Sequence, residues 1–153
     1  MAEDETDIQE PLEDMGPEYS EEEAIAVHSR FTKIIAAVGT AQIFGLLACF
    51  TVWREYPEAD EVQSVMMTSG MIFAIGLAMA VVSYGMFRTS VGISRDAAVM
   101  RREAGEDRAR LLMARERQDD AVKRAQSGFK PLNFSGACFA ASALIGISGL
   151  LSI

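Results

Sequence analysis

Residues that hold metals and haem are scarce in this chain of 153 residues, which has one histidine and two cysteines. His28 stands alone, so it cannot by itself form a bis-histidine haem site or a typical zinc site. Cys49 and Cys138 lie within apolar runs, without CxxC or Cys/His spacing, and we interpret them as small packing residues. We therefore expect no metal and no cofactor.

Charged residues are absent from three long runs. The runs cover residues 34–53, 65–87 and 134–153 and contain no Asp, Glu, Lys, Arg or His. About 20 such residues cross the 30 Å hydrocarbon core of a bilayer. The predicted fold class is an all-α membrane protein with three transmembrane helices, at 34–53, 65–87 and 131–153. A short loop at 54–64 and a charged helical arm at 88–130 connect them.

The missing charges also exclude functions. Ion-coupled transporters, proton relays and voltage sensors normally need an ionisable side chain within the membrane. The chain has no GxGxxG after a strand, no P-loop, no HExxH and no GxSxG. We therefore expect that this protein is not an enzyme.

The charges that are present are unevenly distributed. Residues 1–33 have two basic and eleven acidic side chains, whereas residues 88–130 have eleven basic and seven acidic ones. Short loops rich in Lys and Arg stay on the cytoplasmic side. We predict a multi-pass protein of a prokaryotic cytoplasmic membrane rather than of an organelle. The N-terminus and the arm are then cytoplasmic, and 54–64 and the C-terminus lie outside.

The arm reads as helix, with apolar residues at a spacing near 3.5 to 3.6 that is typical of coiled-coil pairing. An unbroken upright helix could not return the chain to the membrane through residues 128–133. Gly105 suits the residue after a helix C-terminus and Asp107 suits an N-cap, so we predict a hinge at Gly105 and a helical hairpin. The alternative is one helix lying on the membrane surface. We expect Phe129 to Pro131 to end the arm, and Asn133 or Ser135 to cap the third span.

Arginines dominate the arm, and we interpret them as a surface for lipid headgroups or a protein partner. The residues concerned are Arg95, Arg101, Arg102, Arg108, Arg110, Arg115 and Arg117. Interspersed acids and the lack of aromatic residues before Phe129 argue against nucleic acid. Anionic lipid is the expected non-protein partner.

The second and third spans are rich in small residues, which let helices approach closely in lipid. We predict helix-packing roles for Gly70, Gly76, Ala80, Gly136, Ala140, Ser142 and Gly146. These spans are expected to pack against other membrane protein subunits.

The first 19 residues are acidic and are predicted to be a disordered tail. Ile8, Leu12, Met15 and Tyr19 interrupt the acids every three or four residues. This spacing is read either as a peptide motif that docks on a partner or as a solvated charge run. Ser20 begins a capping box, so residues 20–33 are predicted to be an interfacial helix or an extension of the first span.

Two functions fit these features. The first is a non-enzymatic accessory, assembly or scaffold subunit of a larger membrane protein complex. The alternative is a homo-oligomeric pore-forming or stress-effector protein, with Thr68, Ser69 and Ser83, or Ser142 and Ser148, lining the channel. The three-span outline is similar to one class of phage holins, although those end in a charged cytoplasmic tail.

Overall fold

The computed structural model describes the backbone of residues 21–151 and the side chains of residues 29–151. It contains three helices, α1 (Glu21–Glu55), α2 (Asp60–Ala104) and α3 (Arg108–Leu150). Each is long and apolar enough to cross a membrane, and no strand occurs in the described part. The acidic tail at 1–19, the Ser20 cap and the side chain of His28 lie outside the residues described.

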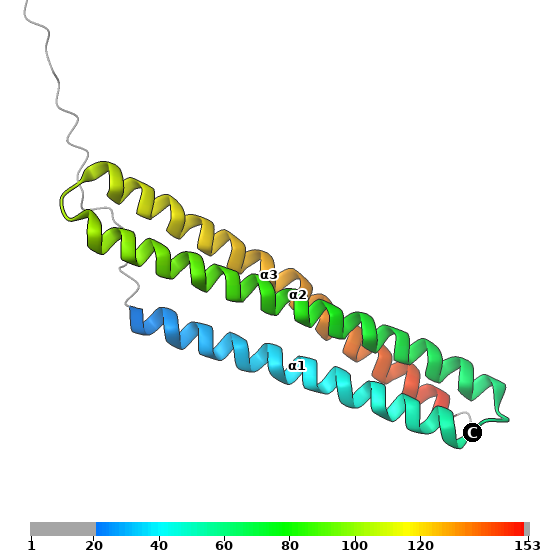
Figure 1. Cartoon of the computed structure of the whole chain (residues 1–153). Helices are drawn as coiled ribbons and strands as arrows, with labels where there is room; N and C mark the ends of the chain where they lie inside the picture. The colour runs from blue at the N-terminus through cyan, green and yellow to red at the C-terminus, as the bar shows by residue number, and fades with distance from the viewer. Residues whose placement is uncertain (1–20, 152–153) are drawn as a thin grey trace, which may run out of the picture.

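The helices lie alongside one another in an elongated bundle (Figure 1). α2 runs antiparallel to both of its neighbours, with short turns at 56–59 and 105–107. α1 packs mainly on α2, and α2 packs on α3 over nearly the whole of both helices. The 56–59 turn and the end of α3 therefore lie at one end of the bundle, while α1 begins on the side of the 105–107 turn.

No break separates the second span from the charged segment. α2 continues from Asp60 through the apolar run to Ala104. At 1.5 Å per residue, its part after Phe87 extends about 25 Å beyond that residue. Residues 88–130, which we call the charged extension, thus continue the same helix pair that contains the second and third apolar runs.

The expected helix boundary at Phe129 to Pro131 is wrong, because α3 continues through Pro131. Proline removes the hydrogen bond that the carbonyl of Ser127 would otherwise accept. Ser127 is exposed, so water or a lipid headgroup can satisfy that carbonyl. Ser135 is not a cap: it is fully buried, and its hydroxyl donates to the carbonyl of Gly76 at 2.7 Å.

Large apolar side chains form two separate clusters. One joins Cys49, Val62, Met66 and Phe73 near the 56–59 turn. The other joins Ile35, Phe87 and Leu132, with Phe31 and Phe129 packed against it. Between and beyond these clusters, the contact between α2 and α3 depends on small residues.

Those small residues recur at every seventh position on both helices. On α2 the buried positions in this register are Val62, Ser69, Gly76, Ser83, Ser90, Ala97 and Ala104. On α3 they are Ala114, Ala121, Gly128, Ser135, Ser142 and Gly149. A strict seven-residue repeat keeps one seam of a helix facing its partner. The same seam therefore runs from the apolar spans into the charged extension.

Candidate functional site

Three serines hydrogen-bond across the seam between α2 and α3. Ser69 donates to the carbonyl of Ser142 at 2.8 Å, and Ser83 donates to the carbonyl of Gly128 at 2.8 Å. Ser135 donates in the opposite direction, from α3 to α2. Such bonds require backbones in close approach, which the small residues of the seam allow.

Gln42 joins α1 to this seam. Its side chain is fully buried, and its Nε2 donates to the carbonyl of Ser135 at 2.7 Å and lies 3.2 Å from the Ser135 hydroxyl. A Cβ added at Gly76 would collide with the Gln42 amide, so only glycine leaves room for this contact. Gln42, Gly76 and Ser135 thus form one junction between all three helices.

The role of Gln42 was missed in the sequence. A lone amide within a charge-free run was its only signal, because burying an amide in lipid is costly without a hydrogen-bond partner. The Oε1 atom of Gln42 and the Oγ atom of Ser142 have no partner among the described residues. These two atoms are the unsatisfied part of the seam.

Most of the predicted packing residues lie between helices. Ala80 and Ser142 are buried, and an ideal Cβ on Gly70 would lie 3.8 Å from the Cβ of Cys49. An ideal Cβ on Gly146 would lie 3.4 Å from the Ser69 hydroxyl. Gly76 is the closest contact of the set.

Gly136 and Ala140 are different, because both are exposed on the outside of α3. An added Cβ on Gly136 would meet nothing within 4 Å. The packing predicted for this pair is therefore not made within the chain. It is left for lipid or another protein.

An aromatic cluster marks the level at which the charges begin. The rings of Phe31 and Phe87 stack with their centroids 5.2 Å apart. The ring of Phe129 packs edge-on against both, with its centroid 4.9 Å from that of Phe31 and 5.2 Å from that of Phe87. Each ring has exposed cations close by in the sequence, namely Arg30, Lys33, Arg88 and Lys130. The cations lie outside the cluster, so all three helices become charged at one level.

Alanines occupy the seam in the charged extension. Ala97, Ala104, Ala114 and Ala121 are at most 6% exposed. Ser94 adds a hydrogen bond to Gln118 at 3.3 Å. Of the larger apolar residues in the arm's repeat, Ile93 and Leu111 are half-buried, whereas Met100 and Val122 are exposed.

The turn at 105–107 contains the predicted hinge. Gly105 has a φ of 53°, which an L side chain rarely adopts. Asp107 precedes α3, and its Oδ1 accepts from the backbone N–H groups of Ala109 at 3.0 Å and Arg110 at 3.3 Å. Its other oxygen lies 3.4 Å from Nε of Arg110.

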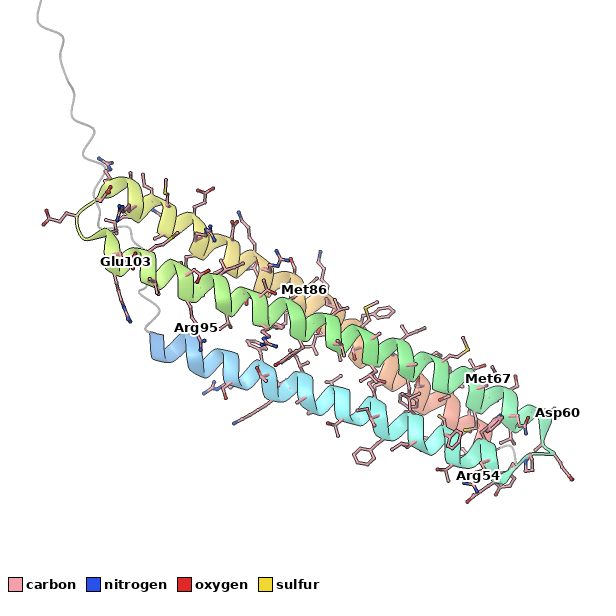
Figure 2. The ribbon with its side chains drawn as sticks, viewed as in Figure 1. Arg54, Asp60, Met67, Met86, Arg95 and Glu103 are labelled. Atoms are coloured by element: carbon pink, nitrogen blue, oxygen red, sulfur yellow. The ribbon has the colours of Figure 1, made fainter. Side chains whose placement is uncertain are left out.

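The predicted surface arginines are all exposed, and they lie along both α2 and α3 rather than around a single pocket. The set comprises Arg95, Arg101, Arg102, Arg108, Arg110, Arg115 and Arg117. Figure 2 shows Arg95 on α2 beside the start of α1, and Arg54 and Asp60 at the far end of the bundle. A shallow groove lies on the other side of the pair, lined by Met100, Met113, Glu116, Arg117 and Asp120.

No metal centre occurs within the described residues, where no three His, Cys, Asp or Glu side chains gather. Comparison with known proteins adds no relative: no family model, curated protein or solved structure matches the chain.

Proposed function

We propose that this chain is a non-enzymatic accessory, assembly or scaffold subunit of a larger membrane protein complex. The observation that carries the proposal is the use of the span serines inside the chain. Ser69, Ser83 and Ser135 all donate to carbonyls of a neighbouring helix. A pore subunit needs polar groups on an outer face, whereas these three serines form hydrogen bonds between helices of the same chain.

The outer surface supplies what a scaffold needs. Gly136 and Ala140 form an exposed surface of small residues on α3, at which another helix can approach closely in lipid. Beyond the spans, α2 and α3 form the charged extension, which we propose is an antiparallel coiled-coil hairpin in the cytoplasm. Its length of about 25 Å suits it to contact a second protein away from the membrane surface.

The cations beside the aromatic cluster support a proposed orientation in the membrane. Arg30, Lys33, Arg88 and Lys130 lie at one level, where cytoplasmic anionic headgroups would surround them. Glu55, Glu58, Asp60 and Glu61 lie at the other end. We therefore propose that the N-terminus and the extension lie in the cytoplasm, with residues 56–59 and the end of α3 outside.

Purification in mild detergent followed by native mass measurement tests the scaffold. The expected result is a co-purifying membrane protein that is lost in the variant Gly136→Leu/Ala140→Leu. The variant Ala74→Leu/Ala78→Leu, which enlarges two exposed residues of α2 at the same spacing, should retain it. A stable lone monomer from native membranes would overturn the proposal.

The homo-oligomeric pore is the alternative. Of the hydroxyls predicted to line its channel, Thr68 and Ser148 are exposed, and both donate to carbonyls of their own helices. Conductance after reconstitution at several protein-to-lipid ratios separates the two functions. The scaffold predicts no conductance, and graded channel activity would favour the pore.

A further inference from the structure

The charged extension has two unlike faces. The face toward α1 is defined by the residues that contact α1 at the aromatic cluster, Phe87 on α2 and Phe129 on α3. Because both helices keep a seven-residue repeat, residues seven, fourteen or twenty-one positions farther toward the turn lie on that same face. We call this surface the α1-side face.

Basic residues gather on the α1-side face. Arg101 follows Phe87 by fourteen residues, and Arg115 and Arg108 precede Phe129 by fourteen and twenty-one. Arg95 lies beside the start of α1 (Figure 2), and Arg88 and Arg102 are one repeat from it on either side. By the same repeat, Asp119 is the one acid on this side of the two helices.

The opposite face is nearly balanced. It carries Arg110, Arg117, Lys123, Arg124 and Lys130 together with Asp96, Glu103, Glu116 and Asp120. This is also the side of the groove between Met100 and Met113. The net positive charge of the extension is thus almost entirely on the α1-side face.

α1 covers only part of that face. Phe31 and Phe87 stack on each other and so lie at the same level of the bundle. From that level toward the 105–107 turn, α1 extends about 15 Å to Glu21, whereas α2 extends about 25 Å to Ala104. The uncovered part includes Arg101, Arg108 and Arg115, which are exposed and have no ion pair with another described residue. Leu111 and the exposed Leu112, which is one repeat from Asp119, add apolar surface beside them.

The segment that precedes α1, residues 1–20, has a charge opposite to that of the uncovered α1-side face. Residues 1–20 contain eight acids and no Lys, Arg or His. Leu12, Met15 and Tyr19 are spaced three and four residues apart and can meet an apolar strip. The covalent link to α1 holds the segment at a local concentration in the millimolar range.

We propose that residues 12–19 of the acidic N-terminal segment dock on the uncovered α1-side face, against Arg101, Arg108 and Arg115. The occupant is the chain's own segment, because it starts about 10 Å from the end of that face and has the opposite charge. Docking covers the most basic surface of the extension. An anionic partner or lipid surface would then have to displace the segment before binding there.

The distance between two spin labels, measured by pulsed electron paramagnetic resonance in the full-length protein, tests the docking. Spin labels go on Gln9→Cys and Gly92→Cys, in a Cys49→Ala/Cys138→Ala background. An added Cβ at Gly92 meets nothing within 4 Å. Docking predicts a narrow distance distribution between about 20 and 35 Å, whereas an undocked segment of this length samples a broad one.

The matched controls are two double charge reversals on α3. Arg108→Glu/Arg115→Glu should broaden the distribution at least twofold, as should 1 M salt. Arg117→Glu/Arg124→Glu makes the same change in charge at the same spacing on the other face, and should leave it narrow. Equal effects of the two reversals, or a broad distribution in the starting protein, would overturn the proposal. Loss of the narrow distribution after dilution with unlabelled protein would also overturn it, because the occupant would then be the segment of a second copy.

Discussion

The two halves of the α2–α3 pair use one geometry with different chemistry. Within the apolar spans the seam is built from serine and glycine, and its serines donate to carbonyls of the partner helix. In the charged extension the seam is alanine. The spacing is seven residues in both halves, so the backbones meet in the same way.

The solvent explains the difference. In water, burying an alanine methyl is favourable by roughly 0.8 kcal/mol, and a narrow alanine seam helps to hold two helices together. In lipid, transfer of a methyl from hydrocarbon to protein gains little, so close packing and hydrogen bonds must stabilise the pair. Serine serves this role because it is small and carries a donor.

The largest expected effect comes from breaking the seam within the spans. Gly76→Leu should lower the free energy of unfolding by about 3 kcal/mol, because the new side chain displaces the Gln42 amide where all three helices meet. Gly85→Leu is the control on the same helix, since an added Cβ there meets nothing within 4 Å. Unfolding by SDS in mixed micelles measures both variants. Equal losses would show that Gly76 is not special.

A smaller effect is expected from breaking the alanine seam. Ala114 is 1% exposed, and Ala114→Leu should cost about 2 kcal/mol by forcing α2 and α3 apart in the extension. Ala109→Leu, at an exposed position of α3, should cost under about 0.5 kcal/mol. Hydrogen exchange of residues 97–121 should accelerate in the first variant alone, while that of the spans stays unchanged. Loss of protection in the spans as well would mean that the halves are not separable.

The smallest effect tests the hydrogen bonds alone. Ser83→Ala removes one donor and keeps the small side chain, so the expected cost is about 0.6 kcal/mol. Ser127→Ala, whose hydroxyl donates to Lys123 within its own exposed helix face, should be nearly neutral. Both are measured by the same SDS unfolding. A cost near zero for Ser83→Ala would assign the stability of the spans to packing only.

The sequence carried different amounts of information about these features. Three charge-free runs were enough to predict three membrane-crossing helices, because the thickness of a bilayer sets the length of such runs. The faces of the span helices were harder to predict. Lipid-facing and buried positions there are both apolar or small, so Gly136 looked equivalent to Gly76 although one is exposed and the other packs on Gln42.

Pro131 and Gln42 show the limits of local signals. Proline usually ends a helix, but the carbonyl that it leaves free belongs to the exposed Ser127, and α3 continues. Gln42 has no local pattern at all, because its partner Ser135 is 93 residues away in the chain. Only the three-dimensional packing reveals that pair.

The antiparallel reversal of the charged segment is the central claim, and one distance tests it. Spin labels on Arg95→Cys and Val122→Cys, in a background without Cys49 and Cys138, lie on the same face of α2 and α3. Packed antiparallel helices with axes 8 to 10 Å apart place the labelled backbones within about 15 Å. One continuous helix over the same residues would separate them by about 40 Å. The shorter distance in lipid bilayers is the predicted result, and the longer one would contradict the helix pair on which the scaffold depends.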